Sequence, residues 1–179
     1  SKVQNDLSSH LWSKDITVTN TNRYVVPRLT KLSDNSIALS SWRKVPNTGS
    51  IDDLGMMRID TTGSILWANY YNYGSDEQFS KVINDGADNL ISVGIVGGGG
   101  GNIVIAKINP DGTHVNSYSY SRGNSNSMAT PDNIIKTIDG GYAICAQYVY
   151  NLSLPDPHKI VLIKLDGNFA IQWVRNISY

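Results

Sequence analysis

Apolar and polar positions alternate in short runs along this chain, and clusters of Asp, Asn and Gly separate the runs. Three of these runs end at an Asp or Asn: "MMRID" (56–60), "IAKIN" (105–109) and "LIKLD" (162–166). Each is followed by a segment rich in aromatic and branched residues, at 65–71, 114–120 and 170–176. Such segments have strand length, and no stretch shows an uninterrupted apolar stripe of helical period. The pattern predicts an all-β chain with almost no helix.

A third kind of segment also recurs, in which two apolar runs flank an Asp, Asn and Gly cluster. Its copies span 29–41, 80–94 and 134–147. Because Asp, Asn and Gly tolerate the left-handed backbone of a tight turn, each copy is typical of a β-hairpin. The chain therefore repeats four strands every 50 or so residues, and this strand number and repeat length are typical of a β-propeller blade. We expect one domain over 1–179, with units at about 12–66, 67–115 and 116–172 and an extra strand at 173–179.

The turns of this repeat share an Asp or Asn, a Gly three positions later and a Trp four beyond that. We expect the Asp to cap a turn between neighbouring blades, the Gly to supply a positive φ, and the Trp to pack between blades. In the second copy Asn116 replaces the Trp, and in the third the glycine has moved to Gly167. The expected structural positions are Asp60, Gly63, Trp67, Asn109, Gly112, Asp166, Trp173 and, more faintly, Trp12.

These motifs carry a family resemblance. "RIDTTGSILWANYY" (58–71) resembles the turn and strand of tryptophan-docking blades in quinoprotein-like propellers. "YGSDEQFSKVI" (73–83) and "IIKTIDGGYAICA" (134–146) are similar to blades of bacterial surface and secreted repeat propellers. The resemblance implies blade architecture and does not point to one enzyme.

Three units amount to about half a propeller, and an open array would expose apolar blade faces at both ends. We therefore expect a second copy or another polypeptide to close the array. A threefold closed barrel, the β-trefoil, is the alternative.

One connection in each unit differs in length and chemistry from its counterparts, at 43–53, 96–102 and 148–158. We place it between the third and fourth strands, where the loops of successive repeats emerge on one face, often the binding face. The candidate binding residues in these loops are Trp42, Arg43, Lys44, Asn47, Asp52, Asp53, Gly97, Gly99, Asn102, Tyr148, Tyr150, Asn151, Asp156 and His158.

Composition and charge exclude several kinds of partner. Fifteen basic and fifteen acidic residues cancel and are scattered, which argues against nucleic acid and anionic membranes. No apolar run approaches the roughly 20 residues that span a bilayer. The single cysteine, Cys145, lies in the apolar run "YAICAQY", and we expect it to be a small buried residue.

Catalytic and metal-binding patterns are nearly absent. The three histidines, His10, His114 and His158, have no ligand spacing. Adjacent carboxylates point to opposite sides of an extended chain, and each Asp turn offers too few oxygens for calcium. The glycines at 97–101 precede a strand, so they predict a flexible hairpin tip and not a phosphate loop. We expect no catalytic residue, no metal and no cofactor.

The functional hypothesis is a non-enzymatic propeller-type module whose loop face contacts a protein or glycan. Eighteen asparagines and ten tyrosines suit an extracellular, cell-surface or virion setting, because both residue types form hydrogen-bonding contacts without strong charge. A structural subunit of a virion or cell-surface assembly is the second hypothesis. A fragment of a quinoprotein-like or glycosidase-like enzyme is the third.

Overall fold

The structure, a computed structural model, describes residues 28–44, 52–73, 77–97, 101–121, 128–149 and 158–177. Every regular element in these ranges is a β-strand, so the predicted all-β class is confirmed. Among the same residues no helix is long and apolar enough to cross a membrane. The strand predicted around Trp12 lies outside the described residues.

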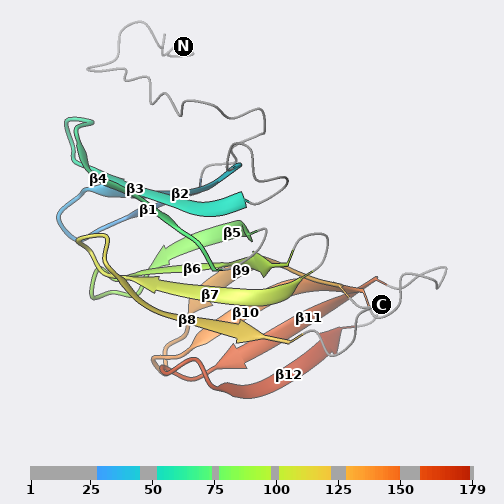
Figure 1. Cartoon of the computed structure of the whole chain (residues 1–179). Helices are drawn as coiled ribbons and strands as arrows, with labels where there is room; N and C mark the ends of the chain where they lie inside the picture. The colour runs from blue at the N-terminus through green and yellow to red at the C-terminus, as the bar shows by residue number, and fades with distance from the viewer. Residues whose placement is uncertain are drawn as a thin grey trace, which may run out of the picture.

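The described strands form three four-stranded antiparallel sheets in tandem along the chain (Figure 1). Sheet 1 contains β1 (Arg28–Lys31), β2 (Ile37–Lys44), β3 (Asp52–Ile59) and β4 (Ile65–Tyr71). Sheet 2 contains β5 (Glu77–Asn84), β6 (Leu90–Val96), β7 (Asn102–Ile108) and β8 (His114–Tyr120). Sheet 3 contains β9 (Met128–Lys136), β10 (Tyr142–Val149), β11 (His158–Leu165) and β12 (Ile171–Ile177).

Each strand pairs with its neighbour in sequence, so every sheet is a meander with a blade-like arrangement. The repeat of four strands is therefore confirmed. The strands stay in three separate sheets, and the β-trefoil alternative is not the fold of the described residues.

The boundaries between sheets differ from the predicted boundaries between units. Each sheet includes, as its last strand, the strand that was predicted to begin the next unit. The Asp60 turn joins β3 to β4 within sheet 1, where Arg58 lies opposite Trp67, and does not connect two sheets. In the same way β12 pairs with β11 and completes sheet 3, so it is not an extra strand. A repeated sequence defines the period, but only hydrogen bonding between strands decides where one sheet ends.

Tight turns of one geometry join the first strand to the second and the third to the fourth in every sheet. In each turn the first residue donates its N–H to the carbonyl of the residue four positions later, as Asp60 does to Ser64 over 2.9 Å. The fourth residue has a positive φ, which favours Gly, Asn or Asp. These fourth residues are Asn35, Gly63, Asp88, Gly112, Gly140 and Phe169.

The turn carboxylates cap the backbone as the sequence suggested. The Asp60 carboxylate accepts the N–H groups of Thr62 and Ser64, and the Asp166 carboxylate accepts those of Asn168 and Ala170. In the third copy the positive φ, 65°, falls on Phe169 and not on Gly167.

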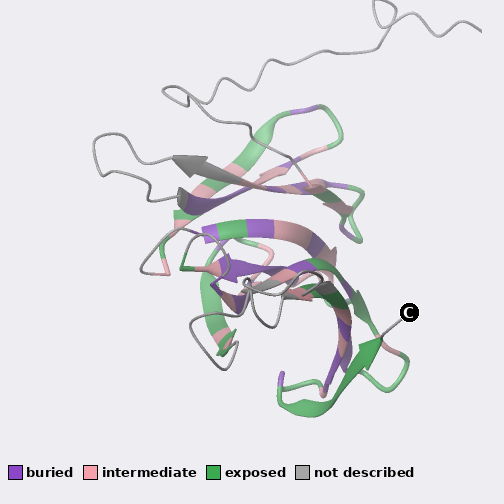
Figure 2. Ribbon diagram, turned by 90° about the vertical axis from the view of Figure 1, so that its right-hand side faces the viewer, coloured by how far each residue is buried: buried purple, intermediate pink, exposed green. Residues whose placement is uncertain are grey.

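The sheets stack face to face in chain order, with the first strand of each later sheet against the preceding sheet. β5 packs against β1, β2 and β3, and β9 packs against β5, β6 and β7. Apolar side chains fill both spaces, and β6 is buried along nearly its whole length (Figure 2). Burial of this apolar surface is the main force that holds the sheets together.

Candidate functional site

The stacked sheets have two unlike edges. The "turn edge" carries the six tight turns, and the "loop edge" at the opposite strand ends carries the connections between second and third strands. Turns of neighbouring sheets lie side by side, since Ser33 of sheet 1 bonds Asp88 of sheet 2. The strand ends that the three loop connections join therefore also lie at one edge. Their predicted position between third and fourth strands is corrected to between second and third.

Donors on β4 hold sheet 1 to the β7–β8 turn of sheet 2. Trp67 donates Nε1–H to the Pro110 carbonyl over 2.8 Å, and Asn69 donates Nδ2–H to the Gly112 carbonyl over 3.0 Å. The Tyr71 hydroxyl also donates to Gly112, over 2.6 Å. Because side chains alternate along a strand, these three share one face of β4. Trp67 is half-buried and docks on the neighbouring sheet.

Gly112 is required where it lies. Its φ is +85°, and an added Cβ would be 2.7 Å from Asn69 Nδ2 and 2.8 Å from Trp67 Cδ2. The indole ring therefore lies directly over a glycine of the next sheet, and the close approach depends on the missing side chain.

The junction of sheets 2 and 3 follows the same plan with other residues. The Tyr120 hydroxyl, at the position of Tyr71, donates to the Phe169 carbonyl over 2.6 Å. Phe169 is buried, stacks on Tyr142 at 4.7 Å between ring centroids, and contacts Tyr118 at 4.8 Å. Asn116 stands where a Trp would, and its Nδ2–H bonds the Tyr118 hydroxyl. Aromatic packing thus takes the place of indole docking at this junction.

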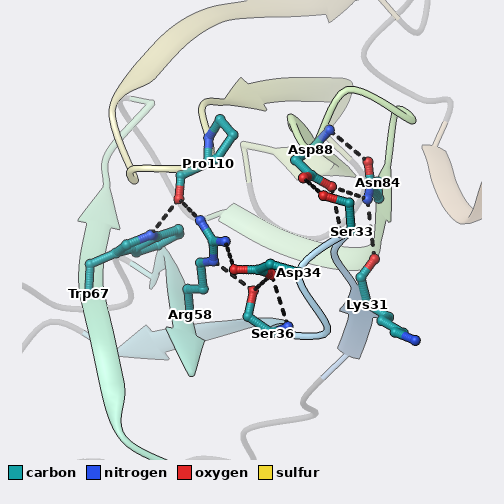
Figure 3. A network of polar contacts seen from close by, with 9 residues as sticks. All are labelled: Lys31, Ser33, Asp34, Ser36, Arg58, Trp67, Asn84, Asp88 and Pro110. Carbon is teal, nitrogen blue, oxygen red and sulfur yellow. Dashed lines mark hydrogen bonds and ion pairs between the residues drawn. The ribbon is translucent and has the colours of Figure 1, made fainter. Parts of the chain in front are cut away.

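A basic residue on the third strand ties the two turns of each sheet together. Arg58 bonds Asp34 at 2.7 Å and also donates Nη1–H to the Pro110 carbonyl of sheet 2 (Figure 3). Lys164 bonds Asp139 at 2.8 Å, and Lys107 lies 3.9 Å from Asp85. The recurrence of a basic residue before each Asp or Asn turn was visible in the sequence, but its partner in the first hairpin turn was not.

A second polar contact links the first turns of sheets 1 and 2. The Asp88 carboxylate accepts the Ser33 N–H over 2.9 Å and the Ser33 hydroxyl, and it also accepts an Asn84 N–H (Figure 3). The hydrogen bonds from Ser33 hold the pKa of Asp88 below its usual value. This carboxylate therefore contributes to the junction in its charged form.

The predicted loop residues fall into four groups, and the fourth of these is tied into the fold. Trp42, Arg43, Lys44, Asp52 and His158 lie at strand ends that border the loop edge. Asn102 begins β7 and lies opposite Val96 at the same edge, next to Gly97, which has a φ of 105°. Asn47, Gly99, Tyr150, Asn151 and Asp156 lie outside the described residues.

Two of the candidates are tied into the fold. Asp53 is buried and accepts an N–H from Asn72 over 3.0 Å. Tyr148 packs against the apolar cluster between sheets 2 and 3. Gly101 is buried as well, and a Cβ there would be 1.7 Å from the Val96 carbonyl oxygen. Position 101 therefore has no room for a side chain.

Trp173 differs from Trp67 in its surroundings. We expected burial between blades, but Trp173 is 43% exposed, and β12 is exposed along its length (Figure 2). Cys145, expected to be buried, is only partly so. Both departures have one cause: no described element covers the outer face of sheet 3.

The docking residues that the sequence reading missed are Asn69, Tyr71, Tyr118, Tyr120 and Phe169. The sequence signal that could have identified four of them is their spacing. Asn69 and Tyr71 lie two and four positions after Trp67, and Tyr118 and Tyr120 lie two and four positions after Asn116. No group of three or more His, Cys, Asp or Glu side chains that could hold a metal occurs in the described ranges.

No protein-family model matches this sequence, and no curated protein matches it closely enough to be identified as a relative.

Proposed function

We propose that this chain is a non-enzymatic binding module built from β-propeller blades, and that its loop edge contacts a protein or glycan partner. The observation that supports it is the placement of three connections at one topological position in three adjacent sheets. Loops held side by side by a rigid scaffold can differ in sequence without changing the strands that carry them.

The two edges differ in how far their residues take part in the hydrogen bonds that hold the sheets together. On the turn edge, the carbonyls and carboxylates bond neighbouring turns and sheets. The strand ends at the loop edge are connected in the sequence by the unlike segments 45–51 "VPNTGSI", 98–100 "GGG" and 150–157 "YNLSLPDP". The third of these offers Tyr150, Asn151 and Asp156, which suit polar contacts to a sugar or a protein surface.

The test is glycan-array binding by the purified chain and by a Tyr150→Ala, Asn151→Ala, Asp156→Ala variant. We expect the variant to weaken binding of any glycan that the chain recognises at least about tenfold. Thr61→Ala is the matched control, because Thr61 is exposed on the turn edge. Binding that the loop variant leaves unchanged would contradict the role of the loop edge.

A structural subunit of a virion or cell-surface assembly is the second candidate. The uncovered outer face of sheet 3 favours it, because apolar surface of this kind commonly marks an interaction site. A chain that binds no glycan and forms a defined assembly would support this candidate over the first.

A further inference from the structure

The outer face of sheet 3 repeats a row of residues that in the other two sheets is buried or half-buried, except for the exposed Asn116. In sheets 1 and 2 this row faces the next sheet. The rows are Thr30–Ala38–Arg58–Trp67 in sheet 1, Ile83–Ile91–Lys107–Asn116 in sheet 2 and Ile135–Ala143–Lys164–Trp173 in sheet 3. In sheet 3 the two ends of the row, Ile135 and Trp173, are exposed.

Two of the three β4 donors of the covered junction have a donor at the same position on this open face, whereas Ile177, at the position of Tyr71, has none. Trp173 has the position of Trp67, whose indole N–H bonds a turn carbonyl of the next sheet. Arg175 has the position of Asn69, which also donates to a turn carbonyl, and Arg175 is exposed. The face is thus equipped to receive a turn whose carbonyls point outward, like the one at 109–113.

Sheet 1 has the complementary open face. The row Val82–Ser92–Ala106 of sheet 2 and the row Ile134–Ile144–Ile163 of sheet 3 are buried against the preceding sheet. The equivalent row of sheet 1 is Leu29–Leu39–Met57. Leu29 is 65% exposed, whereas Val82 and Ile134 are both 0% exposed.

From these two faces we infer that sheet 3 of one molecule binds sheet 1 of a second copy, repeating the junction between sheets 1 and 2. Trp173 then donates its indole N–H to the carbonyl of Thr61, which has the position of Pro110, in the turn 60–64 of the second copy. The contact is heterologous, because two different faces meet. Two copies joined in this way at both ends form a closed ring of six sheets.

This self-association is separate from binding at the loop edge, because it uses sheet faces and not the strand ends. Loss of one therefore does not entail loss of the other, and the two proposals can fail independently.

The test is the mass of the full chain by analytical ultracentrifugation over a concentration series at micromolar levels. We expect a species of twice 19.6 kDa that dissociates on dilution. Trp173→Asp and Leu29→Asp each place a charge on one of the two mating faces and should give folded monomers. Leu66→Asp is the matched control, because Leu66 is 51% exposed and Val115, at the same position in sheet 2, stays 43% exposed although sheet 1 covers that face of sheet 2. It should leave the dimer intact.

Mixing the two monomeric variants gives the decisive result. The Leu29→Asp chain retains an intact sheet 3 face and the Trp173→Asp chain an intact sheet 1 face, so the mixture should recover a dimer through one junction. Failure of the mixture to associate would overturn the heterologous contact. A full chain that remains monomeric throughout the concentration series would overturn the proposal.

Cys145 provides a readout that needs no variant. It is the only cysteine, it is partly exposed, and it lies opposite Leu162 on the open side of sheet 3. Its rate of reaction with a thiol reagent should fall several-fold as protein concentration rises through the dimerisation range. A rate that does not change with concentration would contradict a second copy, and would point to another part of the same chain as the cover.

Discussion

At the scale of single residues, backbone carbonyls of tight turns join one sheet to the next. Pro110 accepts hydrogen bonds from both Trp67 and Arg58, and Gly112 accepts them from Asn69 and Tyr71. Turn carbonyls have no partner in a sheet ladder, so they are available to donors on a neighbouring sheet.

The glycine beneath the indole ring gives the first prediction. Gly112→Ala should lower the free energy of unfolding by about 2 to 4 kcal/mol, because a positive φ disfavours Ala and the Cβ collides with Trp67 and Asn69. Gly140→Ala is the matched control, with a φ of +82° and no atom within 4 Å of the added Cβ. It should cost only about 1 to 2 kcal/mol. Equal costs in urea melts would argue against close docking at Gly112.

Trp67 gives the second prediction. Trp67→Phe removes the indole donor and keeps most of the ring, so it should cost about 1 kcal/mol. Trp67→Ala also removes the ring that covers Gly112, and we expect about 2 to 3 kcal/mol, less than for a fully buried Trp. Denaturant melts of the two variants measure the two contributions separately. An Ala variant no less stable than the Phe variant would show that the ring contributes nothing.

Asp88 gives a prediction about pH. Its pKa is lowered in the folded chain by hydrogen bonds from Ser33, so its contribution is present above the ordinary value of 3.8. The contribution is lost as pH falls through the lower, folded-state pKa. Asp88→Asn should therefore melt at a lower temperature than the parent chain at about pH 7, and the difference should shrink below about pH 4 and vanish at lower pH. Ser33→Ala, which keeps the backbone N–H, should show a weaker version of the same trend.

At the scale of elements, the β6–β7 connection allows two effects on stability to be distinguished: the length of the loop and the space available at one of its glycines. Val96 and Asn102 are paired across the hairpin, and a two-residue turn is compatible with such a pair. Replacing 97–101 with Asn-Gly should therefore change the free energy of unfolding by no more than about 1 kcal/mol. In the loop of native length, Gly101→Ala should be far more costly, because the Cβ overlaps the Val96 carbonyl. Both are measured by denaturant melts, and a shortened loop that prevents folding would show that the strands depend on it.

At the scale of the whole molecule, sheet 2 is covered on both faces and sheets 1 and 3 are each covered on one by described residues. Amide exchange should accordingly be slowest in β6, where six of seven residues are buried, and fastest in β12, where all seven are exposed. We expect rates that differ on the order of 100-fold or more. The measurement belongs on the Trp173→Asp variant, because association of the parent chain would protect β12. Uniform exchange across the sheets would indicate that they open together as one unit.

The sequence by itself determined the strand content, the period of the repeat and the chemistry of the turns. These features are local: side chains alternate with a period of two along a strand, and a positive φ selects Gly, Asn or Asp. Asp60, Gly63 and Gly112 could therefore be placed in turns from their spacing alone. Phe169 could not, because its buried ring and its contacts with Tyr118 and Tyr142 hold a backbone that local preference disfavours.

Only the tertiary structure decided where each sheet ends and which faces are covered. Trp67 and Trp173 occupy equivalent positions in the repeat, yet one docks on Gly112 and the other is exposed. The difference arises because burial depends on a partner element that is distant in sequence, and identical local patterns carry no information about whether that partner is present. Strand pairing likewise placed the Asp60 turn inside a sheet, since hydrogen bonds between β3 and β4, and not the repeat itself, assign β4 to sheet 1.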